Sequence, residues 1–356
     1  MPALPPEFAA AADRTACRTA IRRGSKSFFA AGQMLPGEVR EAAYGLYAFC
    51  RYSDDLVDEA TSASARHAAV ARLGHRIARA YAGEPADTPA DRAFSEIVAA
   101  CAIPEALPQA LIEGFAWDAE GRHYADLDAL HAYAARVAGS VGAMMALIMG
   151  VRSPEALARA CDLGAAMQLT NIARDVGEDA RLGRLYLPRD WMRAAGIDPD
   201  AFLADPRPSP ALAAVVAQLL AEADRLYVQA ADGIALLPTR CRPAIHAAGM
   251  IYREIGRVIA ASGHDSVSRR ARVAGVRKLA LIAQATRAPA AAPGPAAPAL
   301  PQALFLIEAV ARHPLPALGQ RPALRPWWDV AGRVVHVLDL IERMRQREAF
   351  GRSAAS

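Results

Sequence analysis

The chain has 356 residues, of which 53% are hydrophobic, and its 41 lysines and arginines exceed its 37 aspartates and glutamates by only four. This length is sufficient for one large domain or two, with a sizeable buried core. The mild charge, with no basic run interleaved with aromatic residues, argues against a nucleic-acid partner. Five scattered cysteines without a CxxC pair argue against a disulfide framework or a zinc site, and they favour a reducing compartment.

The first residues, MPALPPEFAAAADR, lack the basic start and the apolar run of a secretion signal. No apolar stretch approaches the roughly 20 residues of a membrane-spanning helix. We therefore expect a cytoplasmic protein that associates, at most, with the inner face of the membrane. Alanine and leucine are abundant and strand-like alternation is rare, so we expect an all-α fold with successive helices from about residue 16 to residue 285.

The segment LYAFCRYSDDLVDE, residues 46–59, places polar residues on one face of a predicted helix. These residues are Tyr47, Arg51, Asp54 and Asp58, at spacings of four, three and four. Aspartates this close repel one another unless a cation lies between them. A solvated polar face is the alternative, but the flanking apolar residues favour a largely buried helix.

The segment QLTNIARDVGEDARLGRLYLP, residues 168–188, repeats this pattern on a second predicted helix. Its polar face consists of Gln168, Asn171, Asp175 and Asp179, at spacings of three, four and four. Arg174 lies beside this face, and the polar face of the first helix likewise includes an arginine, Arg51. Two helices with aspartates four residues apart and a nearby arginine indicate a shared site.

Oxygen ligands of this kind are typical of hard divalent cations such as Mg²⁺, which are completed by water and substrate phosphate. Arginine forks would neutralise the phosphate oxygens. A calcium-binding EF-hand loop is absent, and so are the Glu-x-x-His pairs of a di-iron bundle. The residues therefore favour a diphosphate site with Mg²⁺, for which Mn²⁺ could substitute. No GxGxxG element is present, so we expect no nicotinamide cofactor.

The composition changes after residue 287. Residues 288–302 are rich in alanine and proline and predict a linker, so we expect a catalytic domain at 1–287 and an extension at 303–356. In the extension, apolar residues between Val330 and Met344 recur at helical spacing beside Trp327 and Trp328. This amphipathic stripe either packs on the catalytic domain or lies on a membrane surface.

These motifs carry a resemblance to a known family. With GSKSFFAAGQMLP (24–36) and RVAGSVGAMM (136–145), they resemble the head-to-head prenyl synthases of the squalene/phytoene synthase family, and most closely its bacterial phytoene synthases. The resemblance covers roughly residues 17–280. It implies an all-α fold of the isoprenoid synthase type, with a central cavity between two acidic helices. It also implies a prenyltransferase that condenses two geranylgeranyl diphosphates to phytoene through prephytoene diphosphate, in carotenoid biosynthesis.

The family's functional residues carry over by position. On the metal side these are Asp54, Asp58, Asn171, Asp175 and Asp179. The resemblance assigns Arg51 and Arg174 to the catalytic set, and it assigns substrate contacts to Gly24, Ser25, Lys26, Ser27, Tyr47, Gln168 and Tyr252. By themselves, serine and lysine near a helix start would more commonly cap the helix or contact solvent.

Some expectations stay open at this stage. The family often has Tyr-Cys-Tyr where this chain has Ala134, Ala135 and Arg136 after Tyr133, which leaves the course of the second step open. Candidates for the apolar cavity wall are Met144, Met145, Leu147 and Ile148, with an ordinary core role as the alternative. A squalene-type synthase that uses farnesyl diphosphate is the nearest alternative function, and a catalytically inactive assembly factor is an alternative of another class.

Overall fold

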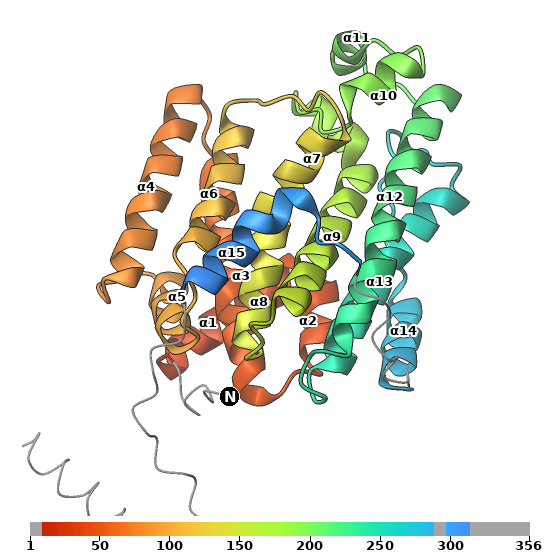
Figure 1. Ribbon diagram of the computed structural model, residues 1–356. Coiled ribbons are helices and arrows are strands. Elements are labelled where there is room, and N and C mark those ends of the chain that lie inside the picture. Colours follow the sequence, from red (N-terminus) through yellow and green to blue (C-terminus); the bar gives the residue numbers. More distant parts are fainter. Residues whose placement is uncertain (1–8, 288–296, 314–356) are drawn as a thin grey trace, which may run out of the picture. The chain divides into compact units, whose positions relative to one another are not determined.

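The computed structural model describes residues 9–287 and 297–313, and all regular structure within these ranges is helical (Figure 1). The predicted all-α fold is therefore confirmed. The chain forms two units, Met1–His313 and Pro314–Ser356, and only the first contains described residues. The predicted stripe from Val330 to Met344 lies outside the described residues, as do both tryptophans beside it. The domain boundaries predicted at 287 and 302 stay predictions.

The helices follow one another with short connections. In chain order they are α1 (Ala11–Gly24), α2 (Lys26–Gly32), α3 (Gly37–Asp58), α4 (Ala63–Tyr81), α5 (Pro89–Ala100), α6 (Ala106–Ala119), α7 (Leu127–Ala134), the π-helical turn η1 (Ala135–Gly139), α8 (Ser140–Ile148), α9 (Pro154–Arg181), α10 (Arg189–Ala194), α11 (Pro199–Ala204), α12 (Pro210–Ile234), α13 (Arg242–Ala261), α14 (Gly275–Arg287), the 3₁₀ turn η2 (Pro301–Ala303) and α15 (Leu304–Arg312).

The longest helix, α9, passes through the middle of the bundle (Figure 1). Ser153 caps its first turn by accepting a hydrogen bond from the Ala156 amide, and Pro154 occupies a position where no amide donor is needed. Helices α8, α12 and α13 pack around it. Glycine makes this packing close: a Cβ at Gly142 of α8 would lie 2.2 Å from the carbonyl oxygen of Ala160.

Helix α3 presents an apolar face to α1 and α5. Val39, Leu46 and Phe49 of this face are buried, and the Phe49 ring stacks on Phe94 with 3.8 Å between the ring centroids. Burial of these side chains contributes roughly 2 kcal/mol each to folding. The helical period then directs the opposite face, with its aspartates, away from this part of the core.

Candidate active site

An apolar cavity lies between the two acidic helices. It has a volume of about 330 Å³ and is lined by residues of α2, α3, η1, α8, α9, α12 and α13. Its polar lining near the aspartates consists of Tyr47 from α3 and of Gln168 and Asn171 from α9. The predicted central cavity is therefore confirmed, and it has the size of an ordinary small-molecule site.

Only part of the predicted apolar wall lines this cavity. Met145 does, whereas Met144, Leu147 and Ile148 are buried elsewhere in the core. The prediction for those three residues is wrong, because adjacent positions on a helix point in different directions and α8 is buried on several sides. Small residues form much of the wall instead, among them Gly32 and Ala160.

The aspartates of α3 are paired with arginines. The Arg51 guanidinium contacts Asp55 at 2.6 Å and Asp54 at 3.3 Å. Asp58, one turn further on, pairs at 2.7 Å with Arg184, which follows the end of α9. This last contact connects the end of α3 to the segment that leaves the second acidic helix.

The aspartates of α9 have two different environments. Asp175 accepts paired hydrogen bonds from Arg174 at 2.6 and 2.8 Å, and from Arg270 at 2.7 and 3.1 Å. Burial alone would raise the pKa of Asp175, but these two arginines outweigh it and hold that pKa below its usual value. Burial, reinforced by the nearby Asp175 charge, raises the pKa of Asp179 to about 7.

Asp54 on the first helix has a raised pKa, as Asp179 does. Burial, together with the neighbouring Asp58 charge, raises the pKa of Asp54 to about 7. Arg51 opposes this shift without cancelling it. Each acidic helix therefore carries a carboxyl group that is held partly protonated near neutral pH, and a cation beside it would favour the charged form.

Asp118 of α6, which the sequence pattern does not indicate, acts electrostatically on both acidic helices. It accepts hydrogen bonds from the hydroxyls of Tyr133 and Tyr186, at 2.8 and 2.7 Å. Burial raises the pKa of Asp118 to about 6, against these two hydrogen bonds. Its charge also raises the pKa values of both Asp54 and Asp179. No other acidic residue lies three or four positions from Asp118, so no helical spacing pattern could have revealed it.

Arg270 and Arg184 were also missed as site residues. Arg184 is contained in the predicted motif, but it lies outside the helical face on which the prediction was based. Arg270 lies 95 positions from its partner Asp175, and only the fold brings them together. At the positions where this chain departs from the family, the Tyr133 hydroxyl donates to Asp118 and Arg136 pairs with Glu113 at 2.9 Å; the course of the second step stays open.

The segment around α2 meets α3 and α13 at the cavity. Ser25 caps α2 by accepting a hydrogen bond from the Phe28 amide, and it also hydrogen-bonds Tyr252. The Phe28 ring stacks on Tyr252 with 4.8 Å between centroids. A Cβ at Gly24 would lie 2.3 Å from the Tyr47 hydroxyl, so glycine permits this close approach.

The remaining substrate-side residues lie around the same end. Lys26 is exposed in the first turn of α2, and Ser27 beside it is half-buried. The positive charge of Lys26 contributes, after burial, to a lowered pKa of Lys278 on α14. Of the predicted substrate-side residues, Tyr47 and Gln168 therefore line the cavity. Gly24 lies against Tyr47, and Ser25 and Tyr252 contact Phe28, which is also a lining residue, whereas Lys26 is exposed and is not among the lining residues.

The donor set fits a hard divalent cation. The Oδ1 atom of Asn171 is buried and has no hydrogen-bond partner, although it lies in the polar wall of the cavity. Within residues 9–287 and 297–313, no three acidic, histidine or cysteine side chains converge as a preformed metal site. Carboxylate oxygens and one free amide oxygen suit Mg²⁺, which commonly takes one or two carboxylates and completes its shell with water and substrate phosphate.

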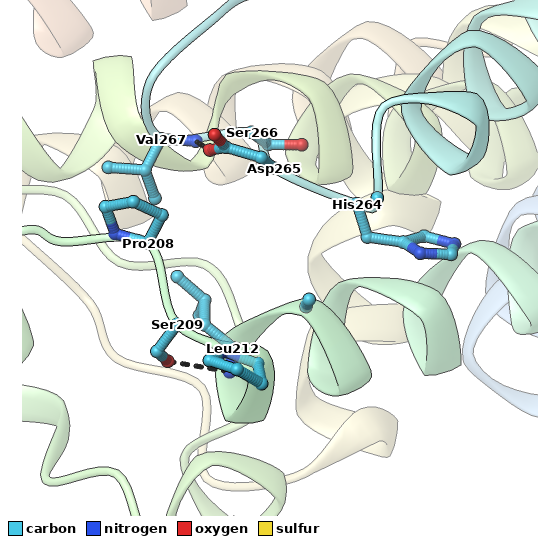
Figure 2. A pocket seen from close by; sticks show the side chains of 10 residues that line it. Pro208, Ser209, Leu212, His264, Asp265, Ser266 and Val267 are labelled. Carbon is cyan, nitrogen blue, oxygen red and sulfur yellow. Dashed lines mark hydrogen bonds between the residues drawn. The ribbon is translucent and has the colours of Figure 1, made fainter.

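A second hollow of about 480 Å³ lies apart from this site, between the start of α12 and the loop after α13 (Figure 2). Ser209, His264 and Ser266 are among its lining residues. The loop packs against the second acidic helix, since the carbonyl of Ser266 accepts a hydrogen bond from the Gly177 amide. None of the predicted site residues lines this hollow.

Solved structures share this fold. A dehydrosqualene synthase in complex with a ligand superposes with a TM-score of 0.71 at 30% identity, over 78% of this chain and 96% of that one. A squalene synthase from Alicyclobacillus acidocaldarius gives 0.64 at 28% identity, over 71% and 95%. The helical bundle and its cavity between acidic helices therefore define an isoprenoid synthase fold.

Sequence comparison gives the family. The squalene/phytoene synthase model matches residues 21–277. A phytoene synthase from Rhodobacter capsulatus is 53% identical over 86% of this chain and 92% of its own, and a 15-cis-phytoene synthase from Paracoccus sp. is 43% identical over 74% and 87%. The chain belongs to the squalene/phytoene synthase family, so the predicted resemblance is confirmed. These relatives confirm the predicted prenyltransferase class, and they favour the phytoene synthase type over the squalene-type alternative.

Proposed function

We propose that this protein condenses two molecules of geranylgeranyl diphosphate to prephytoene diphosphate and rearranges that intermediate to phytoene, with release of both diphosphates. The observation that carries the proposal is one apolar cavity whose polar end joins two arginine-flanked acidic helices. A prenyl diphosphate has an apolar tail and a highly charged diphosphate group, so it requires both an apolar cavity and a polar end. The names of the sequence relatives support the twenty-carbon substrate.

The metal ion is part of the proposal. We infer that Mg²⁺, or Mn²⁺ in its place, binds on the diphosphate side of Asp54, Asp58, Asn171, Asp175 and Asp179. When bound, such an ion neutralises negative charge on the departing diphosphate. The unpartnered Asn171 oxygen and the raised pKa values of Asp54 and Asp179 support this arrangement.

The chain's own cations have a defined task. An allylic carbon releases its diphosphate only if the developing negative charge is met in place, and preorganised donors do this at low reorganisation cost. Arg51, Arg174 and Lys26 have the chemistry for it. Arg174 is already oriented by Asp175, so its fork is fixed before substrate arrives.

The cavity wall protects the reaction from water. The first allylic cation is attacked by the double bond of the second substrate, and loss of a proton closes a cyclopropane ring. A second ionisation releases the other diphosphate, and the rearranged cation then loses a proton to give phytoene. Water would capture either cation, so the apolar lining from α8, α9 and α12 must exclude it.

Release of pyrophosphate from geranylgeranyl diphosphate tests this proposal against an inactive assembly factor. We expect Mg²⁺-dependent release by the wild type and a loss of at least roughly tenfold in Asp175→Asn, because that carboxylate orients Arg174 and Arg270. Asp205→Asn is the matched control, since Asp205 is also paired with an arginine but lies outside the cavity. No release by the wild type would contradict the enzymatic proposal.

We also propose that the protein associates peripherally with an anionic membrane, where its lipid product belongs. No helix in the described ranges is long and apolar enough to cross a bilayer. Between residues 266 and 287 there are six basic residues and no acidic one. Helix α14 in this stretch exposes Val276 and Leu279, at 78% and 67% of their surface. Basic residues beside exposed apolar side chains suit a lipid interface.

Sedimentation with phosphatidylglycerol vesicles tests this second proposal. We expect Leu279→Asp to reduce the bound fraction several-fold, because it removes apolar contact and adds repulsion from the lipid headgroups. Val228→Asp is the control, since Val228 is 55% exposed but lies on α12. If Leu279→Asp binds like the wild type, α14 does not contact the membrane.

A further inference from the structure

An arginine lies in the cavity wall away from the polar end that contains Asn171. Arg159 of α9 is only 6% exposed, and it is one of the cavity-lining residues. Its Nε atom lies 2.8 Å from a carboxylate oxygen of Asp162. Its two terminal nitrogens donate to the carbonyl oxygens of Ala297 and Pro298, both at 3.0 Å. A buried guanidinium is costly unless it is paired in this way.

The residues that Arg159 holds belong to a segment that crosses the bundle. We call residues 297–313 the α15 strap; its helix runs across α8 and α9 in Figure 1 and packs against α6, α8 and α9. Leu306 and Val310 of the strap are buried. At its other end, the carbonyl oxygen of His313 accepts a hydrogen bond of 2.7 Å from Arg152. Arg152 does not line the cavity, although it holds the strap as Arg159 does.

The aliphatic part of the Arg159 side chain is also held in place. A Cβ at Gly233 of α12 would lie 2.2 Å from the Cβ of Arg159, so the two helices are in close contact at this point. The aliphatic part of Arg159 packs against α12, its Nε atom lies beside Asp162, and its terminal nitrogens bind two strap carbonyls. These contacts hold the guanidinium in one position. A hydrocarbon tail that extended past it would have to separate these charged contacts without replacing them.

The position of Arg159 along α9 matches the length of a prenyl tail. Asn171, at the diphosphate end, and Arg159 are twelve residues apart on one continuous helix. At 1.5 Å per residue this separation is about 18 Å. With carbon–carbon bonds of about 1.5 Å, an extended isoprene unit spans roughly 4–5 Å, so four units reach about 18 Å and three units reach about 14 Å.

We propose that Arg159, held by Asp162 and the α15 strap, is the stop near the far end of the tail cavity, one helical turn before Ala156, which also lines it, and that it limits the substrate to twenty carbons. This inference rests on the proposed function and adds a specificity-determining residue to it. The residue acts by excluding longer tails, and it takes no part in ionisation. The same geometry explains why a fifteen-carbon tail would leave the cavity end unfilled.

The test compares allylic diphosphates of 20 and 25 carbons. Replacing the ion pair by apolar residues, in Arg159→Met/Asp162→Leu, avoids leaving a buried charge without a partner. We expect the ratio of kcat/KM for the 25-carbon over the 20-carbon substrate to rise at least about tenfold, because pocket fit changes specificity by this much or more. A ratio cancels any loss of folded protein. Arg159→Lys, which retains a cation, should keep the wild-type ratio.

Two further variants complete the design. Arg152→Met removes the strap contact at His313 but leaves the cavity lining and the Arg159 contacts to Ala297 and Pro298 in place, so it should leave the ratio unchanged. Ala160→Leu adds bulk to the wall just before the stop, and it should shift preference from 20 towards 15 carbons even if the double variant does not fold. Unchanged ratios in both Arg159→Met/Asp162→Leu and Ala160→Leu would overturn the assignment. Failure of the wild type to convert any prenyl diphosphate would instead overturn the proposed function.

Discussion

Acidification from pH 8 to pH 6 should weaken the diphosphate site by protonating two of its carboxylates. Asp54 and Asp179, one on each acidic helix, have pKa values raised to about 7 by burial and by neighbouring carboxylates. Both groups must be ionised to interact with a divalent cation. The perturbation therefore removes charge from both sides of the cavity at once, while Asp175, whose pKa is lowered, stays ionised.

The size of the effect follows from these values. A group with a pKa of about 7 is about nine-tenths ionised at pH 8 and about one-tenth ionised at pH 6. Dependence on one such group predicts about a tenfold loss of apparent Mg²⁺ affinity, and dependence on both predicts a loss approaching about a hundredfold. Because the groups interact through shared neighbours, the titration belongs to the pair.

The assay is the Mg²⁺ concentration that gives half-maximal pyrophosphate release, measured from pH 5.5 to pH 8.5. Asp58→Asn removes the charge that, after burial, contributes most to the raised pKa of Asp54, so its profile should shift to lower pH. Asp205→Asn, outside the cavity, should follow the wild type. A half-maximal concentration that is constant across pH 6 to 8 would refute the reasoning.

Acidification should weaken Mg²⁺ binding but should increase the folding stability of the metal-free protein. Asp54 and Asp179 bind protons more tightly in the folded protein than in the unfolded chain, where the ordinary pKa is 3.8. Their contribution to stability therefore falls as pH rises from about 4 through about 7. Thermal unfolding with a chelator should show part of this loss, and added Mg²⁺ with pyrophosphate should restore stability most strongly at pH 8.

Three further predictions concern single changes. Asparagine at any one of Asp54, Asp58, Asp175 or Asp179 should lower turnover by at least roughly tenfold while circular dichroism stays native, and near-normal activity in two of them would contradict the site. Gly32→Phe should favour 15-carbon over 20-carbon substrate in competition, because a Cβ there already lies 2.9 Å from the Tyr44 ring and the new ring must enter the cavity, at a cost of about 1–3 kcal/mol. Truncation after His313 should keep activity in detergent, since the α15 strap is retained; loss of folding would contradict this.

The two acidic helices could be predicted from sequence because their signal is local. Spacings of three and four place Tyr47, Arg51, Asp54 and Asp58 on one face whatever the rest of the chain does. Asp118 and Arg270 could not be predicted in this way, because each acquires its role from a helix distant in sequence. Arg159 is a similar case: its sequence context indicates an ordinary helical arginine, and only the fold brings strap carbonyls to its fork.

The same limit applies to the cavity wall. Periodicity identified α8 as apolar but could not separate Met145, which lines the cavity, from Met144, which is core. When a helix is apolar on several sides, the pattern carries no information about which side faces a ligand. The positions of its neighbours, here α9 and η1, decide it.

The central claim is that the cavity joins two twenty-carbon substrates, with one diphosphate leaving between the acidic helices before the tails join and the other leaving afterwards. Its most direct test is mass spectrometry of the hydrocarbon made by the purified protein from an equal mixture of farnesyl and geranylgeranyl diphosphates with Mg²⁺. The account predicts a forty-carbon hydrocarbon with the mass of phytoene as the main product. A thirty-carbon product, or no hydrocarbon with either substrate, would contradict it.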